Sequence, residues 1–165
     1  MKKFIFLFLI IFSFIACNQD TKETDQIIEQ EAVLTKPIEI ADVPWMAVVD
    51  STSQNIKMVP SDLVKTENLN YNNVIAALGS KYPESKIVFQ QQQNDTLFVN
   101  IPNATYLTQS NGSMGAKIFM AEVVYSFTQI PGIRFINFSF KEGDHASPGI
   151  FSRVDFPFPK QKTLY

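Results

Sequence analysis

The stretch from Ala116 to Phe140 constrains the fold more than any other part of the chain. Residues 116–130, wound as a helix of about 3.6 residues per turn, place six apolar side chains on one face: Ala116, Phe119, Met120, Val123, Phe127 and Ile130. Pro131 and Gly132 end this predicted helix at Ile130, because proline cannot continue the hydrogen-bond ladder. Aromatic and β-branched residues then predict a strand over 133–140. Because the connection is so short, the helix must pack back onto the sheet that contains this strand.

The remaining elements are weaker but follow a consistent order. We expect strands over 45–50 and 56–59, a helix over 71–78 capped by Asn70 and ended by Gly79, a hairpin of 86–92 and 96–101, a polar loop over 103–110, and a last strand over 150–156. Ser113 is the expected N-cap of the central helix. Two helices and several strands in one sheet favour an α+β fold. The expected architecture is a two-layer sandwich with a mixed β-sheet and two helices on one face, in a βαββαβ-like order.

The amino terminus has the pattern of an export signal. Two lysines precede an almost unbroken apolar segment over 4–15, which is too short for a comfortable membrane span and suits a signal peptide. The segment ends in Ala16-Cys17, and Cys17 is the chain's only cysteine. This junction resembles a bacterial lipobox, although Phe14 stands where leucine is usual. The resemblance implies cleavage after residue 16 and diacylation of Cys17. The alternative is a plain signal peptide followed by an incidental buried cysteine.

These features divide the chain into four parts. Residues 1–16 form the signal peptide, 17–42 a flexible acidic tether, 43–156 one domain and 157–165 a carboxyl-terminal tail. Removing the signal leaves 12 of the 14 basic residues against 16 acidic ones, a net charge of −4, which argues against nucleic acid as a partner. One cysteine allows no internal disulfide. The expected location is the bacterial cell envelope, on a membrane-anchored lipoprotein facing the periplasm or the exterior.

Part of the domain carries a family resemblance. The residues concerned are Asn94–Pro102, Ser113–Ala116 and Ala121–Phe140, the last with a Thr-x-x-Pro-Gly-hydrophobic corner at 128–133. In this order they resemble the GerMN domain of sporulation, germination and other envelope lipoproteins. The resemblance spans about 45–156 and is specific only over 94–140; the first half lacks the usual Leu-Leu-x-Gly-Pro ending of its helix, with Leu78-Gly79 the nearest remnant. It implies a βαββαβ-like fold and a non-catalytic role in envelope assembly.

Two groups of apolar side chains are candidates for an interaction surface. Ile118 and Tyr125 fall away from the core face of the central helix, and Val88, Phe98 and Phe135 fall on the sheet face away from the helices. A two-layer domain should leave that face polar, so these residues predict docking of a protein partner or of a second copy. The alternatives are lone exposed or loop-covered apolar residues on the helix, and strands that are apolar on both faces under the tether or tail.

Candidate chemistry is sparse, and we predict no catalytic residue, metal ligand or cofactor. His145 is the only histidine; with Glu142 and Asp144 it matches no zinc or calcium spacing. Ser113 and Ser147 lack the Gly-x-Ser-x-Gly context of a nucleophile. The first hypothesis is therefore a lipid-anchored envelope protein with a protein-interaction domain. The alternative is a small periplasmic enzyme or ligand-binding module that uses the Glu142–Ser147 loop.

Overall fold

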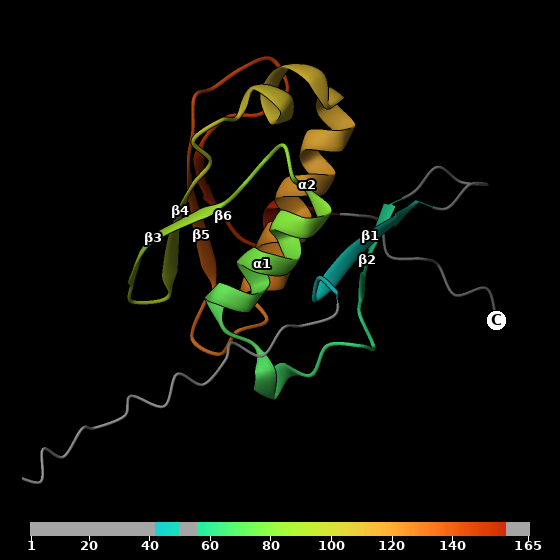
Figure 1. Cartoon of the computed structure of the whole chain (residues 1–165), viewed down its shortest axis with the longest axis vertical. Coiled ribbons are helices and arrows are strands. Elements are labelled where there is room, and N and C mark those ends of the chain that lie inside the picture. Colours follow the sequence, from blue (N-terminus) through green and yellow to red (C-terminus); the bar gives the residue numbers. More distant parts are fainter. Residues whose placement is uncertain (1–41, 50–55, 158–165) are drawn as a thin grey trace, which may run out of the picture. The chain divides into compact units, whose positions relative to one another are not determined.

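A mixed four-stranded sheet forms one side of the domain. The computed structural model describes residues 42–49 and 56–157, so Cys17, the signal peptide and nearly all of the tether lie outside the described residues. The strands follow the order β3 (Val88–Gln93), β4 (Thr96–Asn100), β5 (Phe135–Ser139) and β6 (Gly149–Phe151). Neighbouring strands are antiparallel except β4 and β5, which are parallel. The parallel pair is the one joined by the long connection that contains the central helix (Figure 1).

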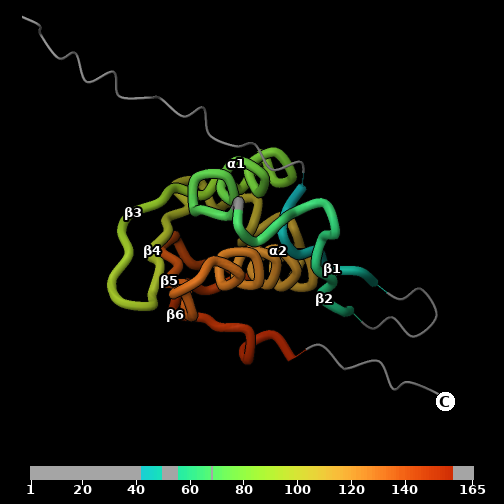
Figure 2. The backbone as a smooth tube through the Cα atoms, turned by 90° about the horizontal axis from the view of Figure 1, so that it is seen from below, coloured from blue at the N-terminus to red at the C-terminus, as the bar shows by residue number. Residues whose placement is uncertain are grey.

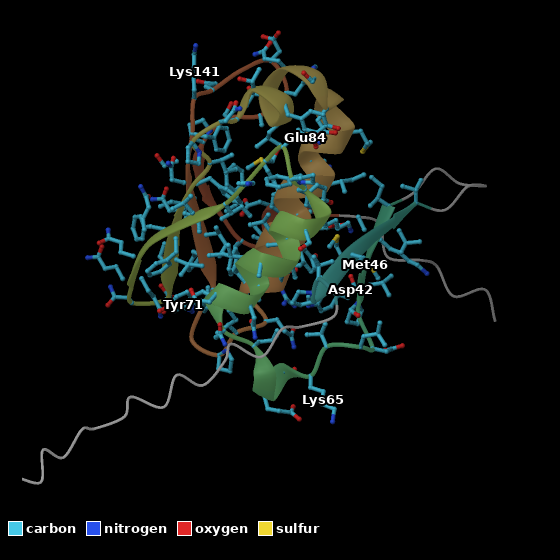
Figure 3. The ribbon with its side chains drawn as sticks, viewed as in Figure 1. Asp42, Met46, Lys65, Tyr71, Glu84 and Lys141 are labelled. Carbon is cyan, nitrogen blue, oxygen red and sulfur yellow. The ribbon has the colours of Figure 1, made fainter. Side chains whose placement is uncertain are left out.

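Two helices cover one face of this sheet, as Figure 2 shows: α1 (Tyr71–Lys81) and α2 (Gly112–Phe127). Alternate strand residues face them and are at most 1% exposed: Leu97, Val99, Ile136 and Phe138. Tyr71, at the start of α1, stacks on Phe89 of β3 with ring centroids 4.5 Å apart (Figure 3). The α+β class, with a mixed sheet and two helices on one face, is confirmed.

The first two strands, β1 (Trp45–Val49) and β2 (Ile56–Pro60), form a separate antiparallel hairpin, so the expected single sheet is wrong here. The hairpin packs against α2 (Figure 1). The backbone N–H of Trp45 donates to Ser126 Oγ at 3.3 Å, and that of Ala47 donates to Glu122 Oε1 at 2.8 Å. Side chains of α2 therefore occupy backbone positions of β1 that a further strand would otherwise use.

Packing between the sheet and the hairpin buries α2 on more than its predicted face. Ala116, Phe119, Met120, Val123 and Phe127 are buried as expected. Glu122 and Ser126, whose side chains bond to β1, are buried as well, and so are Ala121 and Val124. The helix thus has two buried sides, which a single amphipathic pattern does not describe.

Several element boundaries differ from expectation. Asn70 caps α1 through a reciprocal pair of hydrogen bonds with Asn73, as predicted, but the helix runs past Gly79 to Lys81. Ser113 is not the N-cap of α2, because the helix begins at Gly112, directly after the π-helix η2 (Tyr106–Ser110). That π-helix lies where a polar loop was expected. The connection before α1 contains one further short helix, η1 (Thr66–Asn68).

The last predicted strand, over 150–156, is wrong beyond Phe151. The N–H and hydroxyl of Ser152 donate to Asp155 Oδ2 at 2.7 and 2.9 Å, and this cap begins the 3-10 helix η3 (Arg153–Asp155). The same hydrogen bonds lower the pKa of the Asp155 carboxyl. None of the helices in the described ranges is long and apolar enough to cross a membrane.

The carboxylate of Glu122, only 1% exposed, joins α2 to both α1 and β1. Lys81 Nζ lies 2.7 Å from Oε2 and 2.9 Å from Oε1. The hydroxyl of Tyr82 donates to Oε2 at 2.7 Å, and the Ala47 N–H completes the set. Three donors, from α1, from the loop directly after α1 and from β1, thus converge on one buried carboxylate. Such a network specifies one packing arrangement when every polar group in it has a hydrogen-bond partner.

Because of this network, the free energy of unfolding should depend on pH in the alkaline range. Burial, the hydrogen bond to Glu122 and its negative charge all raise the pKa of the Tyr82 hydroxyl. Above about pH 10 the unfolded chain releases this proton while the folded chain retains it, so the free energy of unfolding should fall as pH rises. We expect urea denaturation to show the native protein losing stability relative to Tyr82→Phe above about pH 10. A difference between the two proteins that stays constant with pH would contradict the assignment.

Candidate functional site

The sheet face away from the helices brings the predicted residues Val88, Phe98 and Phe135 together. Val88 pairs with Asn100, which lies two residues beyond Phe98 on β4. Phe98 pairs with Asn137, which lies two residues beyond Phe135 on β5. Directly paired residues point to the same face of a sheet, and diagonal neighbours are within reach of aromatic side chains. The three apolar residues therefore follow a diagonal across β3, β4 and β5.

The structure adds a fourth residue that the sequence reasoning missed. Ile150 on β6 pairs with Asn137 and is 60% exposed, so it lies on the same face, diagonally next to Phe135 and level with Phe98. Val88 is 47% exposed, whereas Phe98 and Phe135 are half-buried. The alternating pattern over 150–156 separated two faces but did not reveal which of them is open. We call Val88, Phe98, Phe135 and Ile150 the diagonal stripe.

Uncharged polar side chains surround the diagonal stripe. On the same face of the four strands lie Gln91, Gln93, Thr96, Asn100, Asn137 and Ser139. Within the described strands, no lysine, arginine, aspartate or glutamate projects from this face. An ion pair between Arg134 and Asp95 lies beside the end of the face where β5 begins. A molecule that docks on this face would thus contact mainly apolar and amide groups, and not a cluster of side chains with the same charge.

Ile118 and Tyr125 lie on α2 and do not adjoin the diagonal stripe. The Tyr125 ring is 5.3 Å from the Trp45 ring and 4.9 Å from the guanidinium carbon of Arg153. Arg153 also donates to the carbonyl of Tyr125 at 2.9 Å, and burial lowers its pKa. Ile118 is half-buried. Trp45 and Arg153 therefore cover the Tyr125 ring, as expected if Tyr125 is an apolar residue covered by other parts of the chain.

The Glu142–Ser147 loop lies against the start of α2. His145 Nδ1 is 3.1 Å from Ser113 Oγ, and the backbone N–H of His145 donates to the carbonyl of Thr108 at 3.0 Å. Within the loop, the Ser147 hydroxyl donates to Glu142 Oε1 at 2.5 Å. These contacts hold the loop against both η2 and the first turn of α2.

The Ser113–His145 pair is the arrangement that comes nearest to catalytic geometry. Serine activation needs a base whose second ring nitrogen is oriented by a third group. In the described part of the chain, no carboxylate is hydrogen-bonded to His145. The same residues also contain no group of three His, Cys, Asp or Glu side chains placed to hold a metal ion. The pair fastens the loop to α2 and lends the enzyme hypothesis no further support.

Two hollows of similar size adjoin the ends of the diagonal stripe. One, of about 470 Å³, includes Val88 in its wall. The other, of about 490 Å³, includes Phe135 together with Arg153 and Val154. A third hollow, of about 280 Å³, lies between 102–109 and Lys141-Glu142. The apolar stripe thus adjoins concave surface at Val88 and at Phe135, in a size range typical of ligand sites.

Comparisons with protein-family models, with curated proteins and with solved structures find no match for this chain. The interpretation of the open sheet face accordingly depends on its own geometry and on the sequence.

Proposed function

We propose that this chain is a lipid-anchored bacterial envelope protein whose single GerMN-like domain has a non-catalytic role in assembly and docks another protein on its open sheet face. The observation that carries the proposal is the diagonal stripe, formed by apolar side chains from four strands. No element of the described ranges packs on this face; both helices lie on the other side (Figure 2). Burying apolar surface is favourable by about 25 cal/mol per Å², so a contiguous exposed stripe favours association.

The chemistry of the face indicates the kind of partner. The face carries mainly apolar and amide groups, and its charged neighbour is Arg134, whose guanidinium carbon lies 5.7 Å from the centre of the Phe135 ring. A complementary partner therefore presents a mainly apolar surface that carries no positive charge near Phe135. The mature chain expected from the signal has a net charge of −4, and like charge disfavours association between copies. We therefore assign the face to a different protein.

The amino-terminal sequence supports an anchored role. A signal-like segment ends at Cys17, and residues 18–41 separate that cysteine from the first described residue, Asp42. Fully extended, this segment spans roughly 80 Å. A tether of that reach allows a domain fixed to one membrane to meet partners some distance from the lipid surface.

The proposal predicts a site-specific contact in the cell. A photo-reactive phenylalanine analogue at position 88 should cross-link to one other protein, because Val88 is exposed at one end of the stripe. Phe135→Ser should reduce the yield of this adduct about thirtyfold, since the loss of one aromatic contact buried in an interface costs about 2 kcal/mol. The measurement is the adduct's yield and its identity by mass spectrometry, in cells that produce the full chain.

Met114 provides the matched control, because it is 58% exposed on α2 and lies outside the stripe. The analogue at position 114 should not give the same adduct, and Met114→Ser should leave the position-88 adduct unchanged. Circular dichroism should show that Phe135→Ser still folds. An adduct of two copies of this chain, or one that is insensitive to Phe135→Ser, would overturn the assignment of the face to a different protein.

A further inference from the structure

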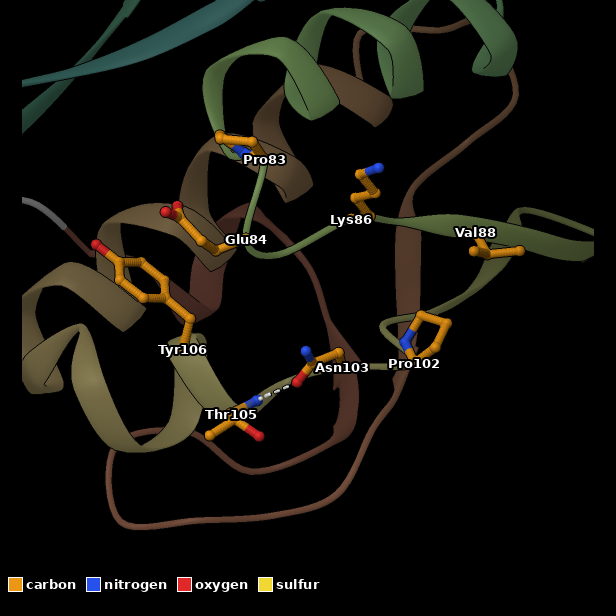
Figure 4. Close-up of a pocket in the computed structure, with 8 residues that line it drawn as sticks. All are labelled: Pro83, Glu84, Lys86, Val88, Pro102, Asn103, Thr105 and Tyr106. Carbon is orange, nitrogen blue, oxygen red and sulfur yellow. Dashed lines mark hydrogen bonds between the residues drawn. The ribbon is translucent and has the colours of Figure 1, made fainter.

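The hollow of about 470 Å³ has two distinct walls, which Figure 4 shows. One wall is the segment Pro83–Val88, which leaves α1 in a turn and runs into β3. The other is Pro102–Tyr106, between β4 and η2. Four of its lining residues are apolar or aromatic and four are polar or charged: Pro83, Val88, Pro102 and Tyr106 against Glu84, Lys86, Asn103 and Thr105.

The first wall begins in a turn, in which the N–H of Ser85 donates to the carbonyl of Tyr82 at 3.0 Å, and buried and exposed side chains alternate along it. Ser85 and Ile87 are buried at 2% and 5% exposure, whereas Glu84, Lys86 and Val88 are exposed. Buried side chains on one side of an extended segment place the intervening side chains on the other side, toward solvent. Figure 4 shows Glu84 directed toward the Tyr106 side of the hollow, whereas the Lys86 side chain runs toward α1, away from Pro102 and Asn103.

The second wall is held by its own hydrogen bonds. The N–H and the hydroxyl of Thr108 both donate to the carbonyl of Ala104, at 2.8 and 2.9 Å. Asn103 Oδ1 accepts from the N–H of Thr105 at 3.3 Å, which leaves the amide nitrogen of Asn103 to other partners. Leu107 and Thr108 are buried directly after Tyr106. The Tyr106 ring, 39% exposed, is therefore presented on an anchored turn.

Three polar side chains of the hollow have no partner among the described residues. Glu84, Lys86 and the Tyr106 hydroxyl form no hydrogen bond or ion pair with any other described residue. One carboxylate and one ammonium group give the walls no net charge. The hollow thus offers an acceptor, several donors and one flat aromatic ring.

We propose that this hollow binds a neutral sugar unit of a glycan. A sugar supplies hydroxyls that donate to Glu84 and accept from Asn103, while its C–H face packs on the Tyr106 ring. An apolar ligand would desolvate both charged groups without giving them partners, which is costly. A phosphate is disfavoured, because its negative charge would lie close to the Glu84 carboxylate. The hollow shares Val88 with the diagonal stripe, but the proposed sugar contacts come from Tyr106, Glu84 and Asn103, so sugar binding and protein docking can be tested separately.

Isothermal titration of the full-length protein tests this assignment. The protein is held in a detergent without a sugar headgroup, and the probes are a neutral N-acetylglucosamine tetramer and a neutral glucose tetramer. We expect saturable binding of at least one probe. Tyr106→Ala should weaken it at least about tenfold and Glu84→Gln about threefold to tenfold. Tyr106→Phe, which keeps the ring, should stay within about threefold of the native protein.

Phe135→Ser and Met114→Ser serve as controls and should bind sugar like the native protein. This result separates the sugar site from the docking face, because Phe135→Ser removes only the protein adduct. The proposal is overturned if neither tetramer binds saturably, or if Tyr106→Ala binds as tightly as the native protein. Tighter binding of inorganic phosphate or of a neutral tetrapeptide than of either sugar would also overturn it.

Discussion

Replacing Glu122 by alanine is expected to lower the free energy of unfolding by about 3 kcal/mol. The substitution removes the acceptor of the Tyr82 hydroxyl and of the Ala47 N–H, and each orphaned buried donor costs about 1–3 kcal/mol. The Lys81 side chain is 35% exposed, so its ammonium group can turn to water and adds less to the cost. The hairpin β1–β2 should also loosen, because Glu122 supplies one of the two side-chain-to-backbone bonds with α2 that the described residues of the hairpin make.

Urea denaturation followed by circular dichroism measures this loss. Glu67→Ala is the matched control, because Glu67 is exposed on η1, and it should change stability by no more than about 0.5 kcal/mol. Glu122→Gln should fall between the two, since the amide oxygen still accepts one bond but carries no charge for Lys81. Equal stability of the Glu122→Ala and Glu67→Ala proteins would show that the carboxylate network contributes nothing to the fold.

Glu122 also shows how far the sequence predicts the central helix. Its period identified the side that packs on the sheet, and the structure confirms Phe119, Val123 and Phe127 there. The same period assigns Glu122 and Ser126 to solvent, because polar side chains usually lie there. Their partners lie in β1, 75 and 81 residues earlier in the chain. A local pattern carries no information about contacts at that separation, so the second buried side of α2 could not be predicted.

For the candidate surfaces too, the sequence identifies some of the residues but not how they are arranged. Phe98 and Phe135 stand out in the sequence because apolar residues occupy both parities of their strands. Their alignment on one diagonal, and the place of Ile150 beside them, follow only from strand order and register. Tyr106 gave no signal, because its segment reads as a polar loop and its position over the hollow depends on the π-helix that follows Thr105.

Replacing Cys17 by alanine is expected to move most of the protein from the membrane fraction to the soluble fraction. The expected anchor is lipid on the sulfur of Cys17, and burial of each acyl CH₂ group contributes about 0.8 kcal/mol, so two chains give stable attachment. Alanine leaves no sulfur to acylate. The measurement is fractionation of cells that produce the full chain, with incorporation of labelled palmitate as the direct readout.

Phe14→Leu is the matched control, since it restores the residue usual at that lipobox position and should leave both fractionation and labelling unchanged. Globomycin, which blocks the lipoprotein signal peptidase, should cause the precursor to accumulate for the native chain but not for Cys17→Ala. The anchor and the docking face are separable by the same assay, because Phe135→Ser changes the cross-linked adduct while its membrane fraction stays that of the native protein. Unchanged fractionation of Cys17→Ala, or native protein that is soluble without detergent, would contradict a lipid anchor and leave the tether without a fixed end.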